Sequence, residues 1–525
     1  DFTCVCEDEG ELFYDGNCVA DPCTDITCPD NSYCVPDLSD SSYTCECSAI
    51  YVDDGEGGCM VKPDAQWTFM MYWAMDNNLT NQSLPELEDW VNVNYNEDVR
   101  MLVLVDPWDQ DGYIAEMLPG EMNIVYDYGG DPDTGDWQTL ADFGVWVVNH
   151  YPAEHYVLIP SDHGGAWREQ TQFGNPVLKS ICHDEHTDNI IGVANGELAA
   201  ALTAITNAAG QKLDFLIYDA CLMATWEMAE VSAPYAEWML ASEESQYGFQ
   251  NYTDWLNLLV ANLDNITNEE LGEAFIDLYS VGGHFNVPGD YYAVTAALTD
   301  LTTTADLTDA VNGFADALLA NEGDTFYADL DQIRMDSQRM EYEFLVDLGD
   351  FARNVTLMDG VPTDVSTAAD ALLAQLDDTV VYDWANIHGS YKELTGATGL
   401  SIYLPPAWFE LGRDLGSALD LGRVRAELRH RRRRRLRREH RGDRLHGHYG
   451  NDLPVDRYVL QERQQPAHRP VVHRAGGRAP RGPGGGGQDR GRRGRPRGLH
   501  HWYSRRGRRV DLRSERLLAD RAQLG

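Results

Sequence analysis

Short apolar runs alternate with amphipathic segments through the middle of the chain. The runs are continuously apolar, which is typical of strands that are covered on both faces. They occupy residues 67–74, 99–106, 154–160, 213–219, 237–242, 291–298 and 399–405. Between them, "WQTLADFGVWVVNHY" places Leu140, Phe143 and Val147 on one helical face. Strands that alternate with such helices predict an α/β fold with a mostly parallel sheet flanked by helices.

Residues 301–395 carry a more helical pattern. Two segments, "DLTDAVNGFADALLANEG" and "MEYEFLVDLGDFARNV", have the spacing of amphipathic helices. We expect them to cover the sheet or to form a small subdomain before the last strand. Since sites in open α/β sheets lie beyond the carboxyl ends of the strands, we look for functional residues there.

Two of the expected strands end in residues that can perform covalent chemistry. One leads to His163 and Gly164 in "YVLIPSDHGGAW", and the other leads to Asp219 and Cys221 in "LDFLIYDAC". A thiol attacks a carbonyl as thiolate, and an imidazole can take its proton and later protonate the leaving amine. A helix that begins just after Cys221 would lower the thiol pKa, and glycine would let backbone N–H groups approach an oxyanion. The alternative interpretation is a packed structural cysteine and an ordinary polar turn.

Cysteine usage sets the amino-terminal part apart. Nine of the eleven cysteines fall within the first sixty residues, which predicts disulfides and an oxidising compartment. From Cys23 the spacing C-x4-C-x5-C-x10-C-x-C-x11-C resembles an EGF-like module over residues 21–60. Residues 1–20 resemble the end of a preceding module, so we expect the chain to begin partway through a longer protein, and residues 61–66 form a linker. The resemblance implies the pairs Cys6–Cys18, Cys23–Cys34, Cys28–Cys45 and Cys47–Cys59.

Charge marks another boundary near residue 422. Residues 1–422 hold 10 Lys and Arg against 76 Asp and Glu, whereas residues 423–525 hold 30 Arg, no Lys and 10 Asp and Glu. The acidic body repels nucleic acid and anionic lipid, so we expect no nucleic-acid partner. The Arg-rich tail also lacks Thr, Ile, Phe, Met and Cys. A shifted reading frame, which turns Asp codons GAC-GAC into Arg codons CGA-CGA, explains this better than a disordered basic tail, and we infer no function from it.

Several separated motifs resemble those of the clostripain-like cysteine peptidases, a family with a caspase-like fold. They are "WTFMMYWAMDNNL", "TLADFGVWVVNHYPAEHYVLIPSDHGGAW", "LDFLIYDACLMATWEMAE", "LASEE" and "GLSIYLP", in the family's order. The resemblance implies a peptidase domain over residues 67–420 that cleaves peptides or proteins and needs no cofactor for its chemistry. It implies a Cys221 nucleophile paired with His163, and an oxyanion hole made by the N–H groups of Gly164 and Cys221.

The resemblance also bears on specificity and processing. Asp219 matches an acid that helps the family to bind Arg or Lys at P1, but Phe249 stands where relatives commonly carry a second acid. Lys179 lies where some relatives cut themselves, and it is either such a site or an ordinary surface lysine. We expect a secreted or surface-displayed endopeptidase, and no run of eighteen apolar residues predicts a membrane span. The alternative is a non-catalytic extracellular adhesion or recognition protein on a peptidase-like scaffold.

A cluster of polar residues, "HDEH" at 183–186, raises the question of a metal. Its histidines and carboxylates are adjacent rather than spaced by one helical turn, which is a poor arrangement for zinc. A structural calcium site is the better hypothesis, because some relatives depend on calcium and acidic loops such as "DPWDQDG" and "GGDPDTGD" are abundant. Without an EF-hand loop the sequence names no ligands, and it makes no prediction of oligomeric state.

Overall fold

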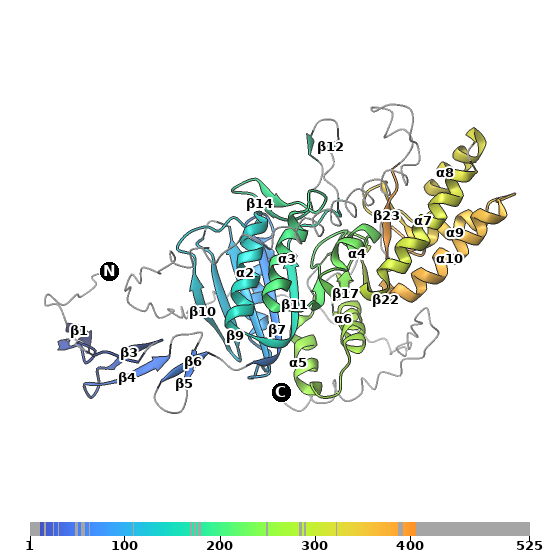
Figure 1. Cartoon of the computed structure of the whole chain (residues 1–525). Coiled ribbons are helices and arrows are strands. Elements are labelled where there is room, and N and C mark those ends of the chain that lie inside the picture. The colour runs from blue at the N-terminus through green and yellow to red at the C-terminus, as the bar shows by residue number, and fades with distance from the viewer. Residues whose placement is uncertain are drawn as a thin grey trace, which may run out of the picture. The chain divides into compact units, whose positions relative to one another are not determined.

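The structure is a computed structural model of the chain (Figure 1). It describes residues 11–14, 17–24, 26–29, 31–47, 51–53, 58–61, 64–108, 110–167, 171–172, 175–176, 180–247, 250–282, 286–287, 290–321, 323–386 and 392–405. The Arg-rich tail lies outside the described residues, as do Cys6, Lys179 and Phe249.

A nine-stranded sheet forms the centre of the domain after residue 64, in the order β10-β9-β8-β7-β11-β16-β17-β20-β22. The strands are β7 (Ala65–Met75), β8 (Val99–Pro107), β9 (Tyr113–Leu118), β10 (Glu121–Asp127), β11 (Ala153–Ser161), β16 (Leu213–Ile217), β17 (Ala236–Ala241), β20 (Thr295–Asp300) and β22 (Val380–Ala385). The five strands from β8 to β17 run parallel, and antiparallel strands extend the sheet at both edges. The predicted α/β fold with a parallel sheet flanked by helices is confirmed.

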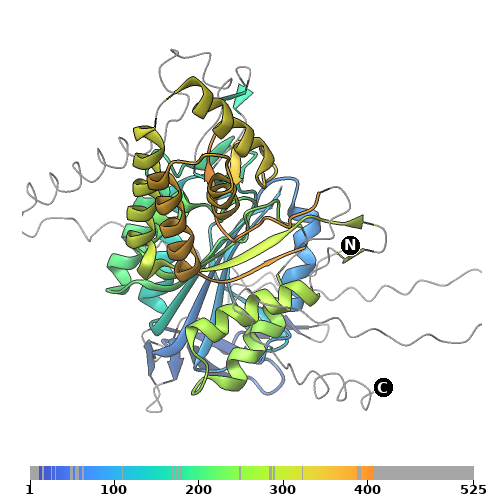
Figure 2. The ribbon, with the colours of Figure 1, turned by 90° about the vertical axis from the view of Figure 1, so that its right-hand side faces the viewer.

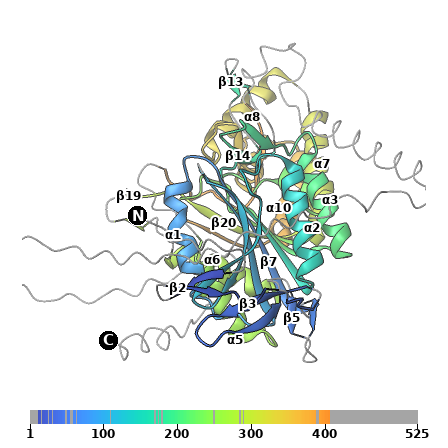
Figure 3. The ribbon, with the colours of Figure 1, turned by 90° about the vertical axis from the view of Figure 1, so that its left-hand side faces the viewer.

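Helices cover both faces of the sheet (Figure 2, Figure 3). They are α1 (Thr80–Trp90), α2 (Trp137–His150), α3 (Glu197–Ala209), α4 (Trp226–Ser232), α5 (Tyr252–Asn262), α6 (Asn268–Gly282), α7 (Thr304–Ala320), α8 (Asp324–Asp336), α9 (Leu348–Thr356), α10 (Thr363–Thr379) and the short η1 (Leu301–Thr303). Figure 3 shows α1 and α6 on one side of the sheet and α2 and α3 on the other. Among the described residues, no helix combines the length and the hydropathy that a membrane span requires.

Strand β7 shows why the apolar runs are continuous. Its Phe69 packs edge-on against Trp255 of α5, with ring centroids 5.5 Å apart. Its Tyr72 points the other way, towards Phe143 of α2 at 5.9 Å. Since successive side chains of a strand alternate between the two faces, a strand between two helical layers must be apolar throughout. Burying each such side chain contributes about 1.5–3 kcal/mol.

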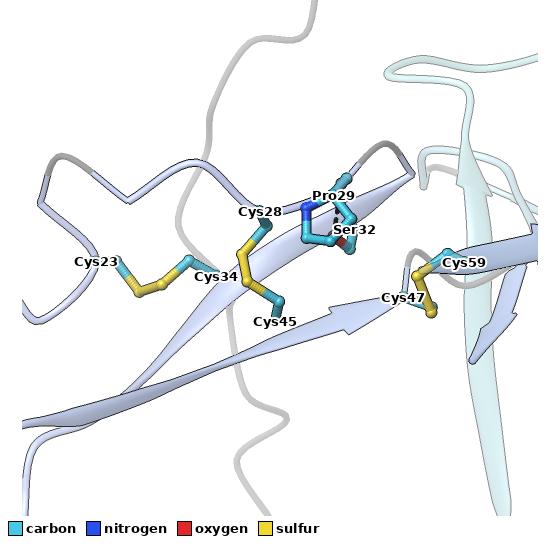
Figure 4. The surroundings of a disulfide bond; sticks show 8 residues. All are labelled: Cys23, Cys28, Pro29, Ser32, Cys34, Cys45, Cys47 and Cys59. Atoms are coloured by element: carbon cyan, nitrogen blue, oxygen red, sulfur yellow. Dashed lines mark hydrogen bonds between the residues drawn. A yellow bond between two sulfur atoms is a disulfide. The ribbon is translucent and has the colours of Figure 1, made fainter. Parts of the chain in front are cut away.

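The remaining strands form hairpins and small sheets. They pair as β1 (Glu11–Tyr14) with β2 (Asn17–Ala20), β3 (Ser32–Asp37) with β4 (Ser42–Cys47), β5 (Tyr51–Asp53) with β6 (Cys59–Val61), β12 (Thr171–Gln172) with β13 (Asn175–Pro176), β14 (Ile181–Asp184) with β15 (Asn189–Ile191), β18 (Asn286–Val287) with β19 (Asp290–Tyr291), and β21 (Leu345–Asp347) with β23 (Ser401–Tyr403). Three disulfides join Cys23 to Cys34, Cys28 to Cys45 and Cys47 to Cys59 (Figure 4). These are the pairs that the EGF-like spacing implies, and the Cys6–Cys18 pair includes a residue outside the described ones.

Two expected elements differ from the prediction. The segment 340–355 is not one helix, because residues 345–347 form β21 and pair with β23 outside the large sheet. Helix α9 starts only after Asp347, whose carboxylate accepts the N–H of Asp350 at 2.7 Å and so caps the helix. The run 291–298 becomes a strand of the large sheet only from Thr295.

Candidate active site

Strands β11 and β16 are parallel neighbours, and both end at the same edge of the sheet. The N–H of Asp162 donates to the carbonyl of Asp219 at 3.2 Å, and the N–H of Asp219 donates to the carbonyl of Pro160 at 3.1 Å. The segments that carry His163 and Cys221 therefore begin on neighbouring strands, and these bonds hold them in register.

Gly164 brings the two segments into direct contact. A methyl group at this position would lie 2.8 Å from Cβ of Ala220 and 3.0 Å from the backbone nitrogen of Cys221. Such distances are too short for carbon in a packed protein, so a residue without a side chain is required. The backbone that follows His163 thus lies against the backbone of Cys221.

Cys221 lies in a turn rather than directly before a helix. Helix α4 begins at Trp226, and the hydroxyl of Thr225 caps it by accepting the N–H of Met228 at 3.2 Å. Leu222 has a φ of +65°. This left-handed conformation is energetically unfavourable for any residue other than glycine. The expectation of a helix amino terminus beside the thiol is wrong, because the chain makes this strained turn before the helix starts.

The bonds around this turn come from segments distant in sequence. The N–H of Leu222 donates to the carbonyl of Glu244 at 3.2 Å, after β17. On the other side, the N–H of Ser401 in β23 donates to the carbonyl of Ala224 at 3.0 Å. The motif "GLSIYLP" therefore lies beside the turn that carries Cys221, although it belongs to a different sheet.

The surroundings of Cys221 disfavour the thiolate. The partly buried thiol accepts the backbone N–H of Gln246, with 3.2 Å between nitrogen and Sγ. Burial raises the pKa of the thiol to about 11, and the negative charges of Glu244, Asp219 and Asp162 add to this effect. The N–H of Gln246 acts in the opposite direction. A neutral thiol is therefore the resting form, and attack requires a group that accepts its proton.

His163 has a hydrogen-bond partner that sequence reasoning missed. Its Nε2 lies 2.8 Å from Oδ1 of Asn78, which follows β7. The neighbouring Asn77 donates from Nδ2 to Oδ1 of Asp162 at 2.7 Å and to the carbonyl of His183 at 3.0 Å. The signal was present in the sequence, since "MDNNL" places polar residues directly after an apolar strand that neighbours β11.

Asp219 lies two residues before Cys221, and Glu86 of α1 is near enough to interact with it electrostatically. Its carboxylate accepts the hydroxyl of Ser161 at 3.1 Å and the side-chain amide of Gln246. Burial raises the pKa of Asp219 to about 6 despite these bonds. Burial also raises the pKa of Glu86 to about 7, with the charge of Asp219 as the next cause. The structure therefore brings a second acid, from another segment, into the electrostatic field of Asp219.

The predicted "HDEH" cluster divides in the structure. Asp184 and His186 join acids from three other segments in two overlapping groups, each with ligand atoms within 4.8 Å of one another. One group is Asp76, Asp131 and His186, and the other is Asp76, Asp106 and Asp184. His183 and Glu185 belong to neither. Asp106 and Asp131 come from the two acidic loops quoted above, whereas Asp76 was missed.

Comparison with known proteins identifies the family. The profile of the Clostripain family matches residues 71–408. Clostripain from Hathewaya histolytica is 26% identical over 409 residues, which cover 64% of this chain and 74% of clostripain. An inactive zymogen C11 protease from Parabacteroides distasonis has a TM-score of 0.50 at 18% identity, over 67% of this chain and 97% of that one. A secreted C11 cysteine protease from Bacteroides thetaiotaomicron has a TM-score of 0.49 at 17% identity, over 65% and 94%. The chain belongs to the clostripain family and is a cysteine peptidase.

Proposed function

We propose that the chain cleaves peptide bonds with Cys221 as the nucleophile and His163 as its proton acceptor. The observation that carries this proposal is the contact between the two strand-end segments, where only glycine at position 164 leaves room for the backbone of Cys221. The hydrogen bond between His163 and Asn78 supports the same assignment, because a proton acceptor must be held in a fixed orientation.

The proposed reaction has two stages. With Nε2–H donated to Asn78, Nδ1 of His163 takes the thiol proton while Sγ attacks the carbonyl carbon. The backbone N–H groups of Gly164 and Cys221 stabilise the oxyanion. The imidazolium then protonates the leaving amine and a thioester remains. Water, deprotonated by the same imidazole, hydrolyses the thioester and restores the thiol.

We further propose a preference for Arg or Lys at P1. Asp219 lies two residues before the nucleophile, and Glu86 adds a second carboxylate whose pKa responds to the charge of Asp219. A bound guanidinium or ammonium group would stabilise both acids in their ionised forms. Glu86 would thus supply the charge that the family pattern places at the position of Phe249, which lies outside the described residues.

The proposed location is outside the cell. Three disulfides within residues 23–59 require oxidising conditions to form and persist. We propose that this region is EGF-like and acts as a spacer or binding element for the peptidase domain. Self-cleavage after Lys179 stays a prediction, which Lys179→Ala tests: the variant should remain one chain on a denaturing gel when the parent is cut.

Thiol labelling tests the catalytic assignment against a non-catalytic scaffold. Near neutral pH, iodoacetamide should modify Cys221 and spare Cys182, which is fully buried and serves as the internal control. His163→Ala should slow the labelling of Cys221, and Cys221→Ala should abolish turnover with an unchanged circular dichroism spectrum. Cleavage by Cys221→Ala at the parental rate would overturn the mechanism, and an unreactive Cys221 would favour the scaffold.

A further inference from the structure

Aromatic side chains from three segments of the chain gather around the turn that carries Cys221. Tyr247 follows β17, Tyr292 precedes β20, and Tyr342 and Phe344 precede β21. None of the four is fully buried, and Tyr247 is 36% exposed. Aromatic rings stabilise a fold most when their large apolar area is removed from water. Rings that stay partly exposed beside a candidate nucleophile therefore need a further explanation.

The first aromatic pair begins one residue beyond a contact with the thiol. The backbone N–H of Gln246 donates to Sγ of Cys221 at 3.2 Å, and its side-chain amide donates to the carboxylate of Asp219. The ring of the next residue, Tyr247, stacks on that of Tyr292 with centroids 4.3 Å apart and an interplanar angle of 19°. Gln246 thus ties this pair both to the nucleophile and to the acid of the proposed P1 pocket.

The second aromatic pair belongs to a segment about a hundred residues further along the chain. The rings of Tyr342 and Phe344 are stacked almost parallel, with centroids 5.2 Å apart and an interplanar angle of 6°. Both residues pack against a small hydrophobic cluster, and Cys221 packs against the same cluster. The buried residues of this cluster are Ala166, Leu222, Ala293, Met340, Leu345 and Leu394. The thiol and the second pair therefore share one apolar support.

The two pairs lie close to each other as well as to the thiol. Burial raises the pKa of Tyr342, and Cys221 and Tyr247 are among the neighbours whose negative charges raise it further. Such interactions are screened by salt over about 10 Å, so Tyr342 lies near both residues. The two pairs therefore border the same part of the active site.

The proposed reaction indicates which part of a substrate these rings meet. His163 protonates the leaving amine and so marks the carboxyl side of the cleaved bond. Tyr247 is tied instead to Gln246, which bonds to the P1 acid Asp219. Since an extended peptide advances only about 3.3 Å per residue, the residue before P1 comes next to Tyr247. This residue is P2.

We propose that the two aromatic pairs form a subsite for an apolar side chain at P2. The pairs are Tyr247 with Tyr292 and Tyr342 with Phe344. The inference rests on the proposed function, because it assigns a second specificity pocket to the same site. Aromatic faces also attract ammonium groups, so Lys is the competing occupant. The apolar cluster behind the second pair favours an apolar side chain, because a charged group would lose hydration there.

Hydrolysis of four fluorogenic peptides by the full chain tests the subsite. The peptides carry Arg at P1 and differ only at P2, which is Gly, Leu, Phe or Lys. We expect kcat/KM to be at least tenfold higher with Leu or Phe than with Gly, and the gain with Lys to be smaller. Equal values with Gly and Leu, or a preference for Lys, would overturn the inference and leave the proposed function intact.

Tyr247→Ala is the decisive variant, because the ring is partly exposed and the hydrogen bond from the hydroxyl of Tyr279 goes to the backbone carbonyl of Tyr247, at 3.1 Å. We expect the ratio of kcat/KM for P2 Leu over P2 Gly to fall to within threefold of one, whereas Tyr247→Phe should keep the parental ratio. Tyr126→Ala is the matched control. Tyr126 also belongs to an aromatic pair, with Tyr128 at 5.0 Å, but it lies on β10 at the edge of the large sheet. A parental ratio in Tyr247→Ala would contradict the inference.

Peptide binding decides the question if the chain hydrolyses none of the four peptides. The full chain carrying Cys221→Ala is titrated by calorimetry with acetyl-Leu-Arg-amide and with acetyl-Gly-Arg-amide. We expect at least fivefold tighter binding of the Leu peptide, and we expect Tyr247→Ala in the same background to remove the difference. This result without hydrolysis would overturn the proposed function alone. Equal affinities, or no binding of either peptide, would overturn the subsite.

Discussion

Asn78 allows the proposed role of His163 to be tested while the imidazole itself is kept. Its Oδ1 lies 2.8 Å from Nε2 of His163, and its side chain is exposed, so Asn78→Ala leaves the core intact. A hydrogen bond to a charged group is worth about 1.5–3 kcal/mol, and exposure to water places this one at the lower end. Loss of about 1.5 kcal/mol in a transition state with a positive imidazole lowers kcat/KM about tenfold.

The assay is hydrolysis of one fluorogenic peptide with Arg at P1, followed from acidic to alkaline pH. Asn78→Asp keeps the acceptor oxygen and adds a negative charge beside the imidazole. We expect this variant to retain most of the parental kcat/KM and to move the limb of the pH profile that reports the imidazole to higher pH, because a negative neighbour stabilises the imidazolium. Asn92→Ala is the control, since Asn92 lies just after α1 and its exposed amide donates to the carbonyl of Glu88 at 3.3 Å.

The reasoning would be refuted by Asn78→Ala with a kcat/KM within twofold of the parent. An equal loss in Asn92→Ala would point to a general effect on the helix instead. A lower melting temperature in Asn78→Ala would show that the residue stabilises the fold rather than orients His163.

Three further outcomes follow from the same geometry. Gly164→Ala should lose most activity and about 1–3 kcal/mol of stability, since its methyl group would collide with Ala220 and Cys221. Denaturant unfolding measures the loss of stability and kcat/KM measures the loss of activity. An unfolding midpoint equal to that of the parent would contradict this expectation. Asp219→Asn should raise KM for a P1-Arg peptide but should keep or raise the melting temperature. Burial raises the pKa of Asp219 to about 6, so the ionised carboxylate destabilises the folded state at pH 7. For the same reason the parental preference for P1 Arg over a neutral residue should decline as the pH falls through about 6, and a constant preference down to pH 5 would exclude Asp219 from the pocket.

The parallel core was predictable because its strands lie between two layers of helices. Strands β9, β10 and β22 were missed, since the prediction relied on continuously apolar runs. β10, "EMNIVYD", has polar and apolar residues mixed and lies at the edge of the sheet, where one side faces water. The boundary between β21 and α9 was missed because it depends on the cap at Asp347 and on pairing with β23, a segment more than fifty residues away.

Only those residues of the candidate site that directly follow an apolar strand could be predicted from the sequence. Cys221 and His163 follow apolar runs, so the sequence alone directs attention to them. The two overlapping groups of acids around Asp76 depend instead on the register of the sheet. Because β7 pairs with β8 so that Ala74 lies opposite Asp106, this acid near the end of β8 comes close to Asp76. Nothing in a chain with 76 Asp and Glu in its first 422 residues indicates which four will meet.

The negative field around Cys221 has two opposite consequences for catalysis. The charges of Glu244, Asp219 and Asp162 raise the pKa of the thiol. In the proposed dyad, the same charges would favour the imidazolium that forms when the imidazole takes the thiol proton. With α4 starting only at Trp226, the helix dipole does not offset the first effect. In the proposed mechanism, the thiol therefore gives up its proton only to a correctly placed imidazole, when an electrophile such as the substrate arrives. Reactivity should therefore depend steeply on where His163 lies, and hence on the short loop after β7 from which Asn78 bonds to the imidazole.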